Sequence, residues 1–186
     1  MLVGKQNPGS WGTSMPVFAN SCVYDVPYVA QQSNQTCWYA AARMIVEYHR
    51  NKMRQTTLEG GAIGQDWANK LVADQNNYIL WANVETFARQ FGFKSIYLCP
   101  TSAGLVDLLR YYGPLWYGGD WAMKSTPVQP TASGHVITIR GCTAVGPTGT
   151  VYVNDPWPKS GPLEIAFDQL FRTLSAVDVV PFLYLP

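Results

Sequence analysis

The chain has 186 residues, of which 13 are Lys or Arg and 12 are Asp or Glu, so its formal net charge is +1. Charged residues make up only 13% of the chain and hydrophobic residues 47%, against roughly 25% charged in average globular proteins. This composition supplies one hydrophobic core and excludes a disordered chain. The near-zero charge excludes a nucleic-acid binder, which needs surplus Lys and Arg for the phosphates. Such a neutral polar surface suits an extended peptide held through its backbone.

The first 22 residues are rich in Gly, Pro, Ser and Asn and predict a flexible arm or linker ahead of one domain over residues 23–186. Residues 1–8 lack the apolar run of a secretory signal peptide, so we expect export by another route. No stretch approaches about 18 uninterrupted apolar residues, which argues against membrane insertion. The four cysteines are too few for a disulfide scaffold and form no CxxC pair for zinc.

The predicted elements fall into two halves. The Ala-rich run 37–49 is free of Gly and Pro and spaces its apolar residues as a helix does, with Thr36 as its N-cap. Further helical patterns cover residues 65–73, 84–90, 103–112 and 167–174. Runs rich in β-branched and aromatic residues predict strands at 115–117, 135–140, 150–154 and 177–185, with a hairpin loop at 146–149. Helices followed by an antiparallel sheet indicate the α+β class.

Cys37 is the candidate nucleophile. It stands in the first turn of the predicted central helix, where free N–H groups and the helix dipole favour a thiolate. A buried structural cysteine is the more common reading of a single Cys. Gln31, six positions upstream in a polar turn, has an amide that can point to the same spot as the Cys37 N–H and form an oxyanion hole. Its neighbour Gln32 is the alternative candidate, and a residue here also fits a solvated turn.

His135 and Asp155 are the candidate base and orienting residue. Pairing positions 135 and 155 puts the chain reversal near residue 145, beside the turn signal, so the two residues should lie on neighbouring strands within a residue or two of register. Asp155 also fits a plain turn former in an Asp-Pro step. By strand alternation Asn154 points to the opposite face unless a bulge intervenes. The same alternation puts the Cys142 side chain on the other face of the strand from His135, where we expect it to lie in the core.

Several motifs together resemble a known family. They are VPYVAQ at residues 26–31, CWYAAARMI at 37–45, GHVI at 134–137 and VNDPW at 153–157. The resemblance covers residues 24–175 and is to the papain-like cysteine proteases, closest to the AvrRpt-type secreted effector proteases of plant-pathogenic bacteria. The bacteriocin-leader cysteine peptidases are more distantly similar.

The resemblance implies a papain-like fold, with the nucleophile on the central helix of an N-terminal helical half and the His and Asp on a C-terminal antiparallel sheet. It assigns Cys37 as nucleophile, His135 as general base and then acid, Asp155 as orienting residue and Gln31 as oxyanion donor, without cofactor or metal. It also implies a toxin or virulence effector that cleaves a protein in the cytoplasm of a target cell. We expect a monomer, although the sequence leaves the oligomeric state open. A host activating factor or a cognate immunity protein would be further partners.

Other features remain open. Trp38 is expected beside the nucleophile, where we predict that it contacts substrate, and Trp121, in the loop before His135, either lines a substrate subsite or anchors that loop. The stretch GSWG at residues 9–12 bears a faint likeness to the self-processing sites of the effectors, although a linker reading is more common. The same catalytic groups also fit a peptidoglycan amidase or endopeptidase, or a glutamine deamidase toxin. A non-catalytic binding module is the third possibility.

Overall fold

The structure is a computed structural model that describes residues 20–33, 35–53, 79, 81–96, 101–121, 134–145, 148–175 and 182–186. Its helices are α1 (Cys37–Met53), α3 (Val84–Gln90), α4 (Ser102–Tyr112) and α5 (Phe167–Ser175), with a 3-10 turn η1 (Trp81–Asn83). Its strands are β1 (Ser21–Val23), β2 (Lys94–Ile96), β3 (Leu115–Gly119), β4 (His135–Val145), β5 (Thr148–Asp155), β6 (Gly161–Ala166) and β7 (Phe182–Tyr184). This mixture of helices and antiparallel strands confirms the α+β class.

The longer predicted elements occur where the sequence places them. Helices α3, α4 and α5 match the three later helical patterns, and α1 begins at Cys37 but continues past the predicted end to Met53. The predicted helix at 65–73 and residues 1–19 of the predicted arm lie outside the described residues. Strands β1, β2 and β6 are not predicted. The first two are too short to show an alternating pattern, and β6 begins with Gly161 and Pro162, which usually signal a turn.

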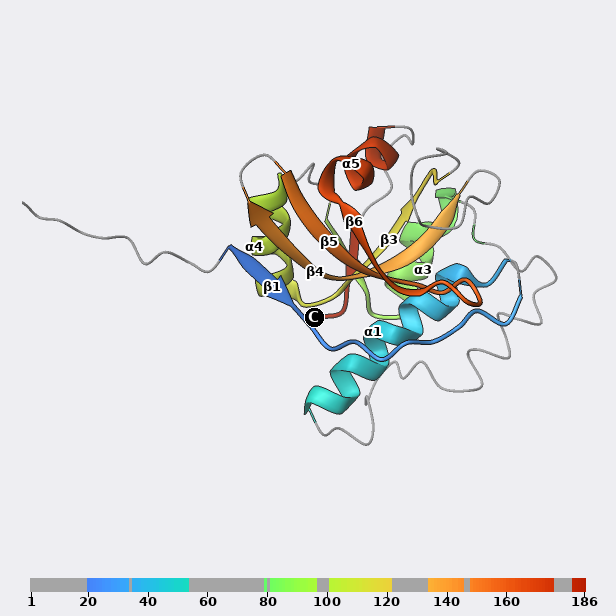
Figure 1. The fold of residues 1–186 in the computed structure, drawn as a ribbon. Helices are drawn as coiled ribbons and strands as arrows, with labels where there is room; N and C mark the ends of the chain where they lie inside the picture. The colour runs from blue at the N-terminus through green and yellow to red at the C-terminus, as the bar shows by residue number, and fades with distance from the viewer. Residues whose placement is uncertain are drawn as a thin grey trace, which may run out of the picture.

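The strands form a single antiparallel sheet in the order β2-β7-β3-β4-β5-β6 (Figure 1). Strand β4 is its longest member and has β5 on one edge. On the other edge, β3 pairs with residues 135–139 and β1 pairs further along with residues 141–143. Ser21 and Cys22, which fall within the predicted arm, are therefore part of the sheet. Every described stretch outside this sheet packs against it or connects its strands.

A β-bulge at Arg140 sets the register between β4 and β5. Pairing runs from Val145↔Thr148 to Gly141↔Tyr152, then shifts by one residue so that Thr138 lies opposite Asn154. The next pair in the shifted ladder would set Asp155 opposite residue 137, two positions from His135, which agrees with the prediction within two residues.

The core lies on both faces of the sheet. On one face, α4 and α5 cover a cluster that includes Ile137, Ile139 and Cys142; on the other, α1 and α3 cover Trp116 and Val136. Figure 1 shows the sheet running between α5 and α1. Cys142 is buried as expected, but the expectation that it faces away from the odd-numbered residues of β4 is wrong. The bulge inserts one residue, so even positions after it share the face of odd positions before it.

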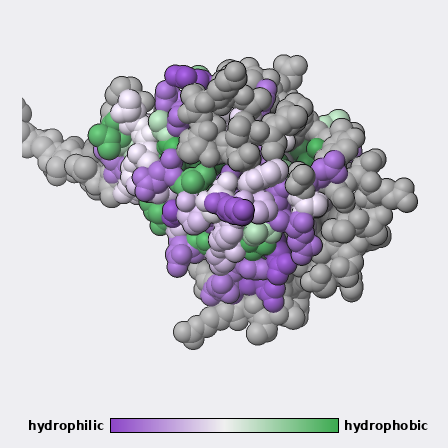
Figure 2. All heavy atoms as spheres, turned by 45° about the vertical axis from the view of Figure 1, so that its right-hand side comes forward, coloured by the Kyte–Doolittle hydropathy of each residue, from purple (hydrophilic) through white to green (hydrophobic). Residues whose placement is uncertain are grey.

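The surface matches the low charge of the sequence. On the face in Figure 2, the described residues form small separate hydrophobic patches among polar ones. Among the residues that the structure describes, the exposed large hydrophobic ones are scattered along the chain: Val23, Tyr28, Tyr111, Val145 and Phe171. No helix within the described ranges is long and apolar enough to cross a membrane.

Candidate active site

Cys37 is the first residue of α1, and its side chain is nearly buried, with 8% of the residue exposed. The carbonyl of Thr36 accepts the first bond of the helix from the N–H of Ala40 at 3.1 Å, so Thr36 occupies the predicted N-cap position. Its hydroxyl bonds instead with the backbone of Ser33. The first turn of α1 contains no acidic side chain. The helix dipole therefore acts on the thiol without an opposing local carboxylate.

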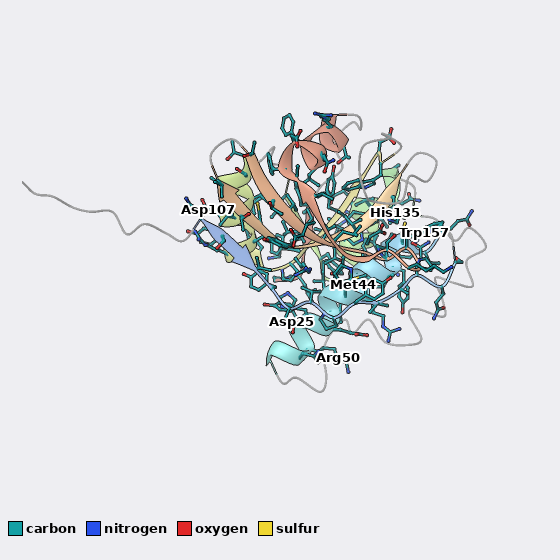
Figure 3. The ribbon with its side chains drawn as sticks, viewed as in Figure 1. Asp25, Met44, Arg50, Asp107, His135 and Trp157 are labelled. Atoms are coloured by element: carbon teal, nitrogen blue, oxygen red, sulfur yellow. The ribbon has the colours of Figure 1, made fainter. Side chains whose placement is uncertain are left out.

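His135 is the first residue of β4 and bonds with Asp155, the last residue of β5. The distance from His135 Nε2 to Asp155 Oδ1 is 2.7 Å, and the side chains are 2% and 0% exposed. The bulge places His135 and Asp155 diagonally across the antiparallel pair. Side chains in this relation can touch when they are long enough. Figure 3 shows His135 near Trp157, on the side of the molecule where α1 begins and away from the end of the helix that carries Arg50.

The pKa of His135 reflects these neighbours. Burial acts to lower it, but hydrogen bonds to Asp155 and to the Cys37 side chain, together with their charges, raise the pKa to about 9. An imidazole with this pKa is protonated at neutral pH. The charged ring is then stabilised by the Asp155 carboxylate on one side and the Cys37 sulfur on the other. The thiol, the imidazole and the carboxylate thus form one connected series from three separate elements.

Asp155 also closes a turn. Its Oδ1 accepts a second hydrogen bond, from the backbone N–H of Trp157, at 2.9 Å. This is the Asx-turn geometry expected of an Asp-Pro step, so the turn-former reading and the orienting reading both describe this side chain. The Trp157 ring lies edge-on to the His135 ring, with centroids 6.4 Å apart (Figure 3). The sequence pattern alone assigns Trp157 no role, although its place directly after Asp-Pro is a signal that could locate it.

Gln31 is buried, with 4% exposed, whereas Gln32 is exposed. The side-chain Nε2 of Gln31 donates to the carbonyl of Ser33 at 2.7 Å, and Oε1 is buried without a hydrogen-bond partner among the described residues. Only the nitrogen end can satisfy a carbonyl, so this contact fixes which way the amide faces. The nitrogen carries a second N–H beyond that contact. Burial therefore favours Gln31 over Gln32 for the oxyanion role.

The two tryptophans predicted to bind substrate are packed inside. Trp38 is 5% exposed and lies edge-on to Phe87, with ring centroids 5.4 Å apart. Trp121 is fully buried, and its indole N–H donates to the backbone carbonyl of His135 at 2.9 Å. This placement gives no support to a substrate contact by either indole. It supports the alternative in which Trp121 anchors the chain before His135; residues 122–133 of that loop lie outside the described part.

A second indole makes a parallel contact. The Trp116 N–H donates to the backbone carbonyl of Trp38 at 2.9 Å, and Trp116 is fully buried. Strand β3 and the residues directly after it therefore supply two indole N–H groups that bond backbone carbonyls, one at His135 and one next to Cys37.

The remaining thiols lie elsewhere: Cys22 faces Cys142 across β1 and β4, and Cys99 is outside the described residues. In the ranges described, no group of three or more His, Cys, Asp or Glu side chains is arranged to hold a metal ion.

A thiol at a helix start, joined to an imidazole and a carboxylate on neighbouring antiparallel strands, is the arrangement of a cysteine peptidase. The family model described as "Papain-like cysteine protease AvrRpt2" matches residues 20–170, most of the chain, and the protein belongs to this family. It is therefore a cysteine-type peptidase, a hydrolase, whose substrate is a protein or peptide. A comparison with curated proteins finds no match to this sequence.

Proposed function

We propose that this peptidase is an effector endopeptidase that is delivered into a target cell and cleaves a protein there through Cys37, His135 and Asp155. The observation that carries the proposal is the position of His135, which bonds with Asp155 at 2.7 Å and has its pKa raised by hydrogen bonds to both Asp155 and Cys37. An imidazole that connects a carboxylate to a thiol is equipped to transfer a proton in both directions.

In the first half of the proposed reaction, the Cys37 thiolate attacks the carbonyl carbon of the scissile peptide bond. The electron pair moves to the carbonyl oxygen, which the Cys37 N–H and the free N–H of the Gln31 amide stabilise. The C–N bond then breaks, and the His135 imidazolium gives its proton to the leaving amine. The product is an acyl group joined to Cys37 by a thioester.

In the second half, neutral His135 takes a proton from a water molecule that attacks the thioester. The tetrahedral intermediate collapses, the C–S bond breaks, and the carboxylic acid product leaves Cys37 as a thiolate beside the imidazolium. Asp155 keeps the imidazole in one tautomer and one orientation through both halves. The buried position of the pair supports this role, because a charge-assisted hydrogen bond is stronger where water is excluded.

The endopeptidase activity is tested first. The full chain is incubated with a proteome-derived peptide library, and cleaved peptides are identified by mass spectrometry for the wild type and for Cys37→Ala. We expect cleavage at a restricted set of sequences by the wild type alone, together with labelling of Cys37 by an epoxide inhibitor. Release of fragments from purified peptidoglycan, or conversion of Gln to Glu in intact proteins, without peptide cleavage would overturn the proposal in favour of an amidase or a deamidase.

The effector role is tested separately. The wild type and Cys37→Ala are expressed inside candidate host cells, and protein termini that appear with the wild type alone are mapped. Cleavage of a host protein supports action in a target cytoplasm. Peptidase activity in vitro without any such termini would leave a peptidase and remove the effector role. The library cleavage is repeated with host cell extract, because greater activity in extract would support a host activating factor.

A further inference from the structure

The segment that carries Gln31 is fastened to the end of β5 by hydrogen bonds, and the two segments are far apart in sequence. We call residues 26–31 the oxyanion segment and residues 154–157 the acid segment. The backbone N–H of Gln31 donates to the carbonyl of Pro156 at 2.8 Å. The Asn154 side chain donates from Nδ2 to the carbonyl of Val26 at 3.0 Å, which ties down the other end of the oxyanion segment.

A third contact joins the middle of the oxyanion segment to the acid segment. The Tyr28 hydroxyl donates to the carbonyl of Trp157 at 3.2 Å, on the exposed side of the junction. Burial, followed by the charge of Asp155, raises the pKa of Tyr28, so the Tyr28 side chain lies close to the active site. Val26 packs against Met44 and Tyr48 of α1, so the oxyanion segment contacts both α1 and the acid segment, and Figure 1 shows it running alongside α1.

The buried position of Asn154 lowers the stability of the fold. It is fully buried, and its Oδ1 has no hydrogen-bond partner within the described part of the chain. A buried amide satisfied at only one end is destabilising compared with an apolar side chain of similar shape. The contact with the Val26 carbonyl is what an apolar residue could not provide.

Alternation along β5 gives two neighbouring side chains two different tasks. Asp155 holds the imidazole of His135, and Asn154, which points to the opposite side of the strand, holds the oxyanion segment. We propose that Asn154 is a positioning residue for the oxyanion donor, and that it keeps the Gln31 amide in place through the Val26 carbonyl and the adjoining Gln31–Pro156 bond. This inference rests on the proposed function. One strand end then fixes both the acid–base group and the oxyanion donor.

The test separates reactions that need an oxyanion hole from one that does not. Peptide turnover and binding of a peptide aldehyde both place a negative oxygen in the hole, whereas alkylation of Cys37 by iodoacetamide needs only the thiolate and the imidazole. The substrate probe is a fluorogenic version of the peptide cleaved best in the library experiment. The variants are Asn154→Leu, Asn154→Asp and Tyr28→Phe in the full chain.

For Asn154→Leu and Asn154→Asp we expect kcat to fall by about 10- to 100-fold and aldehyde affinity to fall in parallel, because a misplaced donor loses most of its effect on the transition state. KM and the alkylation rate of Cys37 should stay within about twofold of the wild type. Tyr28→Phe, which removes the exposed contact, should lower kcat by about two- to fivefold in the same pattern. Amide hydrogen exchange at Gln31 should become faster in each variant, since its bond to Pro156 is less well supported.

The matched control is Thr173→Val, which removes a buried hydroxyl bonded to Tyr117 at 2.9 Å on the far side of the sheet. It should lower stability with little change in kcat. The inference is overturned if kcat and alkylation fall together in the Asn154 variants, or if kcat does not change. If neither Asn154 variant folds, Tyr28→Phe decides, and an unchanged kcat and Gln31 exchange rate would overturn the inference. A wild type that alkylates at Cys37 but cleaves no peptide would overturn the proposed function, and this inference with it.

Discussion

His135 Nε2 and Asp155 Oδ1 lie 2.7 Å apart with both side chains almost completely buried. Neither residue is near the other in sequence, and their contact depends on the bulge that brings two strands into diagonal register. Water cannot compete for either partner in this position, so the carboxylate is available to the imidazole at all times.

Replacing Asp155 should separate orientation from charge. Asp155→Ala removes the acceptor for both His135 Nε2 and the Trp157 N–H, and we expect kcat/KM to fall by about 10²- to 10³-fold. Asp155→Asn keeps a carbonyl oxygen that accepts the same two hydrogen bonds, and we expect a loss of about tenfold. Steady-state kinetics on a fluorogenic peptide measure both. A larger loss in Asn than in Ala would contradict an orienting role.

The raised pKa of His135 predicts how stability depends on pH. Because the pKa is about 9 in the folded state and about 6.5 in the unfolded chain, the folded protein binds the proton more tightly. The stabilisation is fully present below pH 6.5 and is lost as the pH rises through 9, with an upper bound of about 3 kcal/mol. Urea denaturation between pH 6 and pH 9.5 measures it. In Asp155→Asn this decrease should be smaller, and an equal decrease would assign it to another group.

Thiol reactivity should follow position in the fold. Burial, followed by the neighbouring Cys22, raises the pKa of Cys142 to about 11, so its thiolate is scarce at neutral pH. We expect iodoacetamide at pH 7 to label Cys37 first and Cys142 last among the described cysteines. Mass spectrometry of peptides from timed samples gives the order. In urea the rates should converge, and early labelling of Cys142 in the folded protein would contradict the burial argument.

The two indole contacts predict matched losses of stability. Trp121→Phe removes the indole N–H that bonds the carbonyl of His135, and Trp116→Phe removes the one that bonds the carbonyl of Trp38. Each change should lower the free energy of unfolding by about 1–3 kcal/mol, because one buried hydrogen bond and part of the packing of a buried indole are lost. Tyr111→Phe, at an exposed position, is the control and should have no measurable effect. Equal stability of Trp121→Phe and the control would mean that the indole does not anchor His135.

The sequence predicts the parts of this site that depend on local pattern. The helical run starting at Cys37 and the two strands around a turn near residue 146 each carry their own signal in spacing and composition. The bulge at Arg140 has no such signal in the sequence, because Arg-Gly also occurs in regular strands. The bulge becomes visible only when β5 and β1 are paired with β4. For the same reason the sequence left open whether Trp121 is buried: its N–H partner is set by the pairing of β3 with β4.

The bulge also limits how the hairpin can change length. If the register from Val145↔Thr148 continued without the shift, residue 139 would lie opposite Asn154, and Asn154 rather than Asp155 would share the face of His135. Any single insertion or deletion between the bulge and the site would therefore turn the Asp155 carboxylate to the face of the strand opposite the imidazole. Relatives that keep this acid should differ in that stretch by even numbers of residues, or lose the bulge whenever they differ by one.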